Sequence, residues 1–206
     1  GETVTLLRDV AVTDTLVVDG TVTLDLNGFT VSKVTDGEIT AYDQLIVNNG
    51  DLTIEDSVGN GKLSYKYVGS TVSTGFAVTT ITNKDGATLT VNGGTIENNT
   101  ATSMTAYAID SQTYGKTTTL NINGSEVVAI KGEGRGLAIR ACVNGTGNGN
   151  NVVNVTGGTI TGGYGALQIF NISNKDNAAD VNITGGTFNG VYAMYTSFMG
   201  ADTTSV

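Results

Sequence analysis

The sequence predicts an all-β chain, folded as a right-handed, single-stranded parallel β-helix of about seven coils of about 30 residues, in one domain over residues 1–206. Three observations predict it: the composition, a strand-and-corner block that recurs along the chain, and a second family of strands with the same period. Only 14% of the residues are charged, which argues against long solvated helices, and there are 29 glycines but no proline. Valine and threonine favour pleated, half-buried surfaces, whereas asparagine and glycine supply turns with positive φ.

The recurring block is a short strand followed by a glycine corner. It reads LDLNGFTV, LTIEDSVGNGKL, LTVNGGTI, LNINGSEV, VNVTGGTI and VNITGGTF, and begins at residues 24, 52, 89, 120, 153 and 181. Apolar and polar residues alternate, as in a strand with one buried face. The inward pairs are Leu24/Leu26, Leu89/Val91, Leu120/Ile122, Val153/Val155 and Val181/Ile183. A further apolar residue follows each corner and is expected to form a second buried column of Val31, Leu63, Ile96, Val127, Ile160 and Phe188.

A second family of apolar strands has the same period of about 30 residues. We align these strands on Val17, Ile46, Val78, Ile109, Ile139, Ile169 and Met194. Each repeat is therefore a strand, a corner, a short strand, a loop and another strand. One repeat has no way to bury its own apolar side, whereas stacked coils bury a continuous column.

A sandwich of hairpins is the competing all-β fold. It would show turn signals roughly every 8–12 residues and tight two-residue turns. Here only two or three residues separate each glycine corner from the next apolar position, which favours a corner within a coil. The leucine spacing and helix of a leucine-rich repeat are not visible in the sequence.

Charge and composition exclude several functions. The sequence has no histidine, so a Ser-His-Asp triad, a Cys-His pair and a histidine general base are all excluded. The net charge of −9 argues against nucleic acid, whose phosphates need a basic surface, and no apolar run is long enough for membrane insertion as a helix. The single cysteine, Cys142, is expected to be a small buried residue.

The opening stretch TVTLLRDVAVTDTLVVDGTVTLDLNGFTV (residues 3–31) and the later VNGGTI and VTGGTI motifs resemble pectate-lyase-like β-helix regions of large surface proteins from Gram-positive gut bacteria. The resemblance extends over nearly the whole chain. It implies a secreted or cell-surface bacterial protein, of which this chain is one segment, with the signal and the anchor elsewhere. The last coil ends after one strand and a tail at residues 199–206, with no following block, and because an exposed solenoid end needs a cap we expect the polypeptide to continue beyond Val206. The resemblance does not fix an activity, because this solenoid hosts lyases, hydrolases and non-catalytic adhesins.

The second strand family offers a candidate binding surface. Equivalent residues of neighbouring coils lie about 4.8 Å apart. If Phe76, Tyr107, Leu137, Leu167 and Tyr192 face inward with the anchors, one outward column is Ala77, Ala108, Ala138, Gln168 and Ala193. The other outward column is Thr79, Asp110, Arg140, Phe170 and Tyr195. An alanine floor beside polar and aromatic side chains predicts a shallow groove.

Asp110 and Arg140 fall on adjacent coils of that outward column. They are the candidate acid–base or sugar-binding residues, with Phe170 and Tyr195 as stacking platforms for a sugar ring. The favoured alternative is an ordinary cross-coil ion pair, worth about 0.2–1 kcal/mol when exposed. Pectate lyases of the family that the chain resembles use several acidic residues holding Ca²⁺ and an arginine base, and here one acid stands beside one arginine. The pectin hydrolases use paired aspartates and a histidine, which this sequence does not offer.

Glu55 and Asp56 are the candidate metal ligands, at the corner of the second block. They precede the glycine-rich stretch of residues 57–61, and carboxylate and carbonyl oxygens are what Ca²⁺ prefers. A solvated acidic corner is the favoured alternative, and we expect no other cofactor.

Two function classes remain open. The favoured one is a non-catalytic surface or secreted module that acts as a rigid spacer or adhesin and binds glycans. Its partners would be host or plant glycans or surface proteins, and we expect a monomer or weak end-to-end association. The alternative is a lyase or hydrolase acting on acidic polysaccharide, which would need more converging carboxylates than Asp110 provides.

Overall fold

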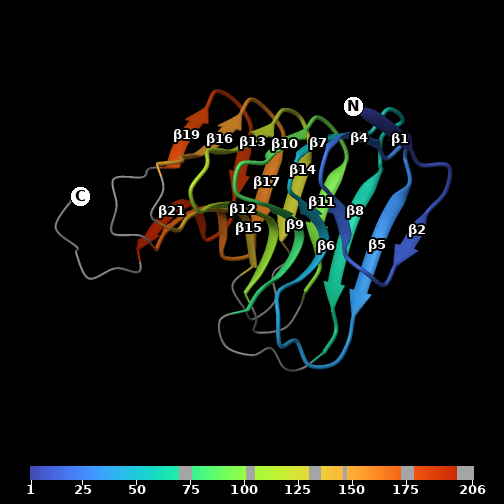
Figure 1. Cartoon of the computed structure of the whole chain (residues 1–206), viewed down its shortest axis with the longest axis horizontal. Coiled ribbons are helices and arrows are strands. Elements are labelled where there is room, and N and C mark those ends of the chain that lie inside the picture. The colour runs from blue at the N-terminus through green and yellow to red at the C-terminus, as the bar shows by residue number, and fades with distance from the viewer. Residues whose placement is uncertain (70–75, 101–104, 130–135, 146–147, 173–178, 199–206) are drawn as a thin grey trace.

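The computed structural model describes residues 1–69, 76–100, 105–129, 136–145, 148–172 and 179–198. Three parallel sheets of seven strands run along one stack, and each coil contributes one strand to each sheet (Figure 1). In Figure 1 the stack runs horizontally, from the blue N-terminal coil to the red C-terminal coil. No helix is present among the described residues. The predicted all-β, parallel β-helix fold is confirmed.

Every third strand along the chain belongs to the same sheet. The first sheet contains β1 (Glu2–Thr5), β4 (Thr21–Asp25), β7 (Asp51–Glu55), β10 (Thr88–Val91), β13 (Thr118–Ile122), β16 (Asn151–Val155) and β19 (Ala179–Ile183). The second sheet contains β2 (Val10–Val12), β5 (Thr30–Thr35), β8 (Lys62–Tyr67), β11 (Thr95–Asn98), β14 (Glu126–Ala129), β17 (Thr159–Gly162) and β20 (Thr187–Asn189). The third sheet contains β3 (Leu16–Val18), β6 (Asp43–Asn48), β9 (Val78–Asn83), β12 (Ala106–Thr113), β15 (Gly136–Val143), β18 (Gly165–Asn171) and β21 (Tyr192–Phe198).

The core lies between the three sheets and is built from stacked apolar columns. The alternating pairs predicted for the middle coils are fully buried in β10, β13 and β16. The predicted column after the corner is also confirmed, in register from coil to coil: Val31, Leu63, Ile96, Val127, Ile160 and Phe188. Alternation with one buried face therefore predicted the inward residues of the middle coils and the column after the corner.

The first block departs from the predicted alignment by two residues. Val22 pairs with Leu52, and Leu24 pairs with Ile54, so Leu26 lies beyond the strand at the corner. Leu26 is fully buried there. A Cβ on Gly61 would lie 2.6 Å from the Leu26 side chain, and one on Gly94 would lie 2.7 Å from it. Leu26 thus fills the space that the corner glycines of the next two coils leave open.

The third sheet corrects the predicted strand alignment. The strands are in register through Leu16, Ile46, Ile81, Ile109, Ile139, Leu167 and Met194. The five inner members of this column are buried in the core, whereas Leu16 and Met194, in the first and last strands of the sheet, are exposed. The sequence alignment placed Val17, Val78 and Ile169 in this column. The structure has Leu16, Ile81 and Leu167 there instead. The reason is that β9, β12 and β15 are buried at every residue, so they lack the alternation that would set a register.

An ion pair between a buried lysine and a partly buried aspartate joins the second and third sheets. The Lys33 ammonium lies 2.6 Å from an Asp43 carboxylate oxygen and donates to the carbonyl oxygen of Gln44 at 2.9 Å. The Tyr65 hydroxyl donates to the other Asp43 oxygen at 2.7 Å. Burial raises the pKa of Asp43, but hydrogen bonds from Lys33, Thr35 and Tyr65 outweigh burial and hold that pKa below its usual value. The buried charge of Lys33 is therefore compensated.

Candidate functional site

The outer face of the third sheet carries a groove of about 720 Å³. It is lined by Tyr42, Phe76, Ala77, Thr105, Tyr107, Leu137, Arg140, Tyr164, Gln168, Phe170, Ile172, Tyr195, Thr196 and Ser197. Ala77, Tyr107 and Leu137 form a small apolar cluster, separate from the main core, against which Tyr164 and Tyr195 pack. The groove therefore runs across neighbouring coils and has an aromatic floor.

Asp110 and Arg140 lie side by side, as their adjacent coils predicted, and Arg140 lines the groove. They are paired in register on β12 and β15. Arg140 Nε donates to Asp110 Oδ1 at 2.8 Å, and the guanidinium Nη2 donates to Oδ2. The Gln112 amide donates to the same carboxylate at 2.7 Å. The pair was expected on an exposed outward row, but Asp110 is fully buried and the Arg140 side chain is 9% exposed.

The ion pair fixes the charge state of Arg140. Burial lowers the pKa of the guanidinium, but the adjacent Asp110 carboxylate outweighs burial and holds the pKa of Arg140 well above its ordinary value. The side chain therefore keeps its proton and does not offer a general base. Both charge-assisted hydrogen bonds point to Asp110, so the carboxylate neutralises Arg140 within the protein.

Aromatic rings surround Arg140 on the groove side. The guanidinium carbon lies 4.3 Å from the centre of the Tyr107 ring and 5.6 Å from the centre of the Phe170 ring. These distances are in the range of cation–π contacts. Tyr107 is nearly buried, whereas Phe170 is partly exposed. Both rings also contribute to the lining of the groove.

Further rings lie at the two ends of the groove. At the C-terminal end, the Tyr164 ring is 5.5 Å from the Tyr195 ring, at 87° to it. Gly165 makes this arrangement possible, because a Cβ there would lie 2.6 Å from the Tyr195 ring. At the other end, Tyr42 and Phe76 meet edge to face at 5.7 Å. Three of the four candidate residues named from sequence, Arg140, Phe170 and Tyr195, thus line one groove, and the fourth, Asp110, is hydrogen-bonded to Arg140. More aromatic residues line the groove than the sequence indicated.

The columns predicted for this face need correction. The row that contains the ion pair reads Thr82, Asp110, Arg140, Gln168 and Tyr195. Phe170 lies two residues further along its strand, in register with Cys142, and Thr79 is buried opposite Tyr107. The alanine floor is wrong as well, because Ala108 and Ala138 lie in the main core.

The cause of this error is a change of face within the strands. Ala108 and Ile109 both pack in the core, so Tyr107 before them and Asp110 after them both face outward. The same small-then-large apolar doublet recurs as Ala138–Ile139 and Ala166–Leu167. Sequence reasoning therefore placed Tyr107 and Leu137 inside and missed them as groove residues. The repeated doublet was the signal that could have found them.

Gln168 is another groove residue whose importance the sequence did not indicate. It is 8% exposed, and its Nε2 donates to the Ser197 hydroxyl at 2.8 Å. Its Oε1 is buried and has no hydrogen-bond partner. A buried amide oxygen without a partner is costly, so it marks a position where a further polar group would be accommodated.

Cys142 is buried, as predicted, on the strand that carries Arg140. Burial raises the pKa of its thiol to about 12, although the charge of Arg140 acts in the opposite direction. The thiol therefore stays protonated near neutral pH and is a poor nucleophile.

The candidate calcium corner uses its carboxylates within the protein. Asp56 Oδ1 accepts the backbone N–H of Gly28 at 2.8 Å, and Oδ2 accepts that of Gly61 at 2.7 Å. Glu55 Oε1 accepts the Asn92 amide at 2.7 Å. No group of three or more Asp, Glu, His or Cys side chains suited to a metal occurs in the described part of the chain. Asp56 thus ties together the corners of two coils.

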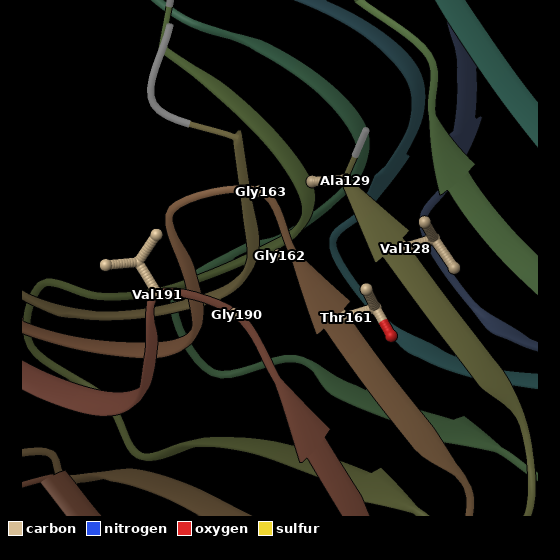
Figure 2. Close-up of a pocket in the computed structure, with 7 residues that line it drawn as sticks. All are labelled: Val128, Ala129, Thr161, Gly162, Gly163, Gly190 and Val191. Atoms are coloured by element: carbon tan, nitrogen blue, oxygen red, sulfur yellow. The ribbon is translucent and has the colours of Figure 1, made fainter. Parts of the chain in front are cut away.

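A second hollow of about 480 Å³ lies where the second sheet turns into the third (Figure 2). It is lined by Val128, Ala129, Thr161, Gly162, Gly163, Gly190 and Val191. Figure 2 shows Val128 and Thr161 side by side on β14 and β17, with Val191 across from them. Thr161 is the one polar side chain in this lining, so the hollow offers little chemistry compared with the groove.

Comparison with protein-family models, with curated proteins and with solved structures finds no match for the chain. The assignment of the fold as a parallel β-solenoid therefore rests on the structure alone. Among the residues that the structure covers, none forms a helix long and apolar enough to cross a membrane. The tail at residues 199–206, on which we based the expectation that the polypeptide continues, lies outside the described residues.

Proposed function

We propose that the chain is a non-catalytic, glycan-binding module of a secreted or cell-surface bacterial protein of the pectate-lyase-like β-helix kind. The observation that carries the proposal is the groove on the third sheet, where aromatic rings line an open channel around an arginine that is already paired. The module would act as a rigid spacer or adhesin, and host or plant glycans would be its ligands.

The aromatic lining supports a carbohydrate ligand. Sugar rings have apolar faces that pack on aromatic side chains, while their hydroxyl groups hydrogen-bond at the edges. Partly exposed rings of Tyr42, Phe170 and Tyr195 offer such faces at successive places along the groove. The row from Asp110 to Tyr195 extends over three coil spacings, or about 14 Å, which suits a short stretch of a polymer better than a single sugar.

The ion pair supports binding rather than catalysis. A lyase base must lose its proton, and a hydrolase acid must reach the glycosidic oxygen. Arg140 is held protonated by Asp110, and Asp110 is fully buried beneath it. Arg140 therefore does not lose its proton as a lyase base must, and Asp110 does not reach a glycosidic oxygen as a hydrolase acid must. These two properties disfavour the alternative, an enzyme acting on acidic polysaccharide.

The stack itself supports the role of a spacer. Continuous apolar columns join successive coils, and buried amides tie their corners together. Asn48 donates to Asn83 at 2.9 Å, and Asn83 donates to the carbonyl oxygen of Thr119 at 2.9 Å. Such cross-coil bonding satisfies buried backbone groups and stiffens a solenoid.

One screen tests binding against catalysis. The chain is run by affinity electrophoresis through gels containing neutral and acidic polysaccharides, and the same polysaccharides are incubated with it, with and without Ca²⁺. We expect retardation in at least one gel, no unsaturated product by absorbance and no new reducing ends. Product formation that is lost in Arg140→Ala would overturn the proposal in favour of an enzyme. Absence of retardation in every gel would overturn glycan binding.

A further inference from the structure

Building on the proposed function, we infer that the groove takes an uncharged glycan, and that Gln168 selects it by a hydrogen bond to a sugar hydroxyl. The inference names the chemical class of the ligand and a specificity-determining residue.

The first argument is the charge of the groove. Of the lining residues in the described part of the chain, Arg140 alone carries a charge at neutral pH. Its guanidinium makes two hydrogen bonds to the Asp110 carboxylate, which cancels that charge locally. A sugar carboxylate that approached the remaining N–H groups of Arg140 would meet a charge that Asp110 has already neutralised, and it would be repelled by the Asp110 carboxylate on the same guanidinium. The net charge of −9 also repels an acidic polymer as it approaches.

The second argument is the unpaired end of the Gln168 amide. The side chain is 92% buried, lies between Arg140 and Tyr195 in the groove row, and leaves Oε1 without a partner. The other end of the amide is already used, since Nε2 donates to the Ser197 hydroxyl at 2.8 Å. The oxygen is therefore the end of the amide that remains to be paired.

A sugar hydroxyl suits the unpaired Oε1 because it donates a hydrogen bond. It reaches Oε1 after a small rotation of the Gln168 side chain. The neighbouring Phe170 ring lies two residues along the same strand and lines the same groove. A pyranose that packs on Phe170 is thereby positioned to direct an equatorial hydroxyl toward Gln168. A carboxylate accepts but does not donate, and it would lie next to the buried Asp110.

The experiment compares matched ligands and matched variants. Binding is measured by calorimetry for polygalacturonate, alginate and hyaluronan, each beside its carboxyl-reduced, uncharged counterpart, together with neutral glucan, mannan and galactan. The variants are Gln168→Met, which keeps side-chain length but removes the amide, and Gln44→Met. Gln44 is also on the third sheet and also 8% exposed, but it does not line the groove.

We expect at least one uncharged polymer to bind more tightly than every acidic one, with little dependence on salt. Gln168→Met should weaken that binding on the order of tenfold, and Gln44→Met should leave it unchanged. Tighter binding of the acidic member of a matched pair would overturn the inference while the proposed function stands. Equal binding by wild type and Gln168→Met would overturn the role of Gln168. No binding to any polymer would overturn the proposed function itself.

Discussion

The sharpest stability prediction concerns the Asp110–Arg140 pair. Asp110→Asn keeps the shape of the side chain but removes its charge, so Arg140 is left without its counter-ion with only 9% of its side chain exposed. Removing one partner of a buried pair costs about 3–5 kcal/mol, whereas an exposed pair contributes about 0.2–1 kcal/mol. In Asp110→Asn the Tyr107 ring, 4.3 Å away, still contacts the guanidinium, and Arg140 still borders the groove, where water reaches it. We therefore expect a loss of unfolding free energy at the lower end of that range, about 3 kcal/mol.

Urea unfolding followed by circular dichroism provides the assay. With a slope of roughly 2–3 kcal/mol per molar urea, a loss of about 3 kcal/mol lowers the midpoint by about 1 M or more. Glu97→Gln is the matched control, because Glu97 pairs with Lys62 at 3.7 Å and Lys62 is 44% exposed. Its midpoint should fall by less than about 0.5 M. Asp110→Asn combined with Arg140→Met removes both buried charges and should recover much of the loss. Equal midpoints for Asp110→Asn and Glu97→Gln would refute the claim that the pair is buried.

Three further predictions follow from the scaffold. Leu26→Ala should cost about 2–5 kcal/mol in urea unfolding, because the facing corner glycines have no side chain to fill the cavity, and a loss below 1 kcal/mol would contradict that packing. Cys142 should react with iodoacetamide slowly in the folded chain and rapidly in urea, since burial raises the pKa of its thiol to about 12; fast reaction of the folded chain would contradict this. Stability should also decline in acid. Burial raises the pKa of Asp85, but the three backbone N–H groups that its carboxylate accepts, together with the charge of Lys116, outweigh burial, and the pKa of Asp43 is lowered as well. Because both pKa values are lower in the folded chain, their stabilisation is complete above the ordinary carboxyl pKa of about 4 and is lost as the pH falls through the folded values. Urea midpoints measured down to about pH 2 should fall in that window, less steeply in Asp85→Asn, and a flat profile would contradict the assignment.

The sequence predicted the first two sheets well because one physical signal governs them. In strands such as β10 and β13, apolar residues face the core and threonine or asparagine faces solvent, so the period of two fixes which side each residue takes. The corner column from Val31 to Phe188 followed from the same logic. The shift of the first block escaped prediction because Leu26 continues the alternation although its backbone has already entered the corner.

The third sheet could not be predicted as well, and the groove depends on it. Its strands β9, β12 and β15 are buried at every residue, and in β12 the face changes at the doublet Ala108–Ile109. A strict period of two therefore assigns the residues before that doublet to the wrong side. Asp110 and Arg140 were predicted to be neighbours because they are one coil apart in sequence. That prediction does not depend on which face of the strand each residue takes. Their burial could not be predicted, since it depends on rings contributed by Tyr107 and Phe170, from different coils.

The most direct test of the central claim compares two tyrosines in one glycan-binding measurement. Tyr42 and Tyr114 are each 42% exposed, but Tyr42 lines the groove and Tyr114 does not. With the polysaccharide that most retards the wild-type chain as the probe, we predict about tenfold weaker binding for Tyr42→Ala and unchanged binding for Tyr114→Ala. Equal affinities for the two variants would contradict binding in the groove.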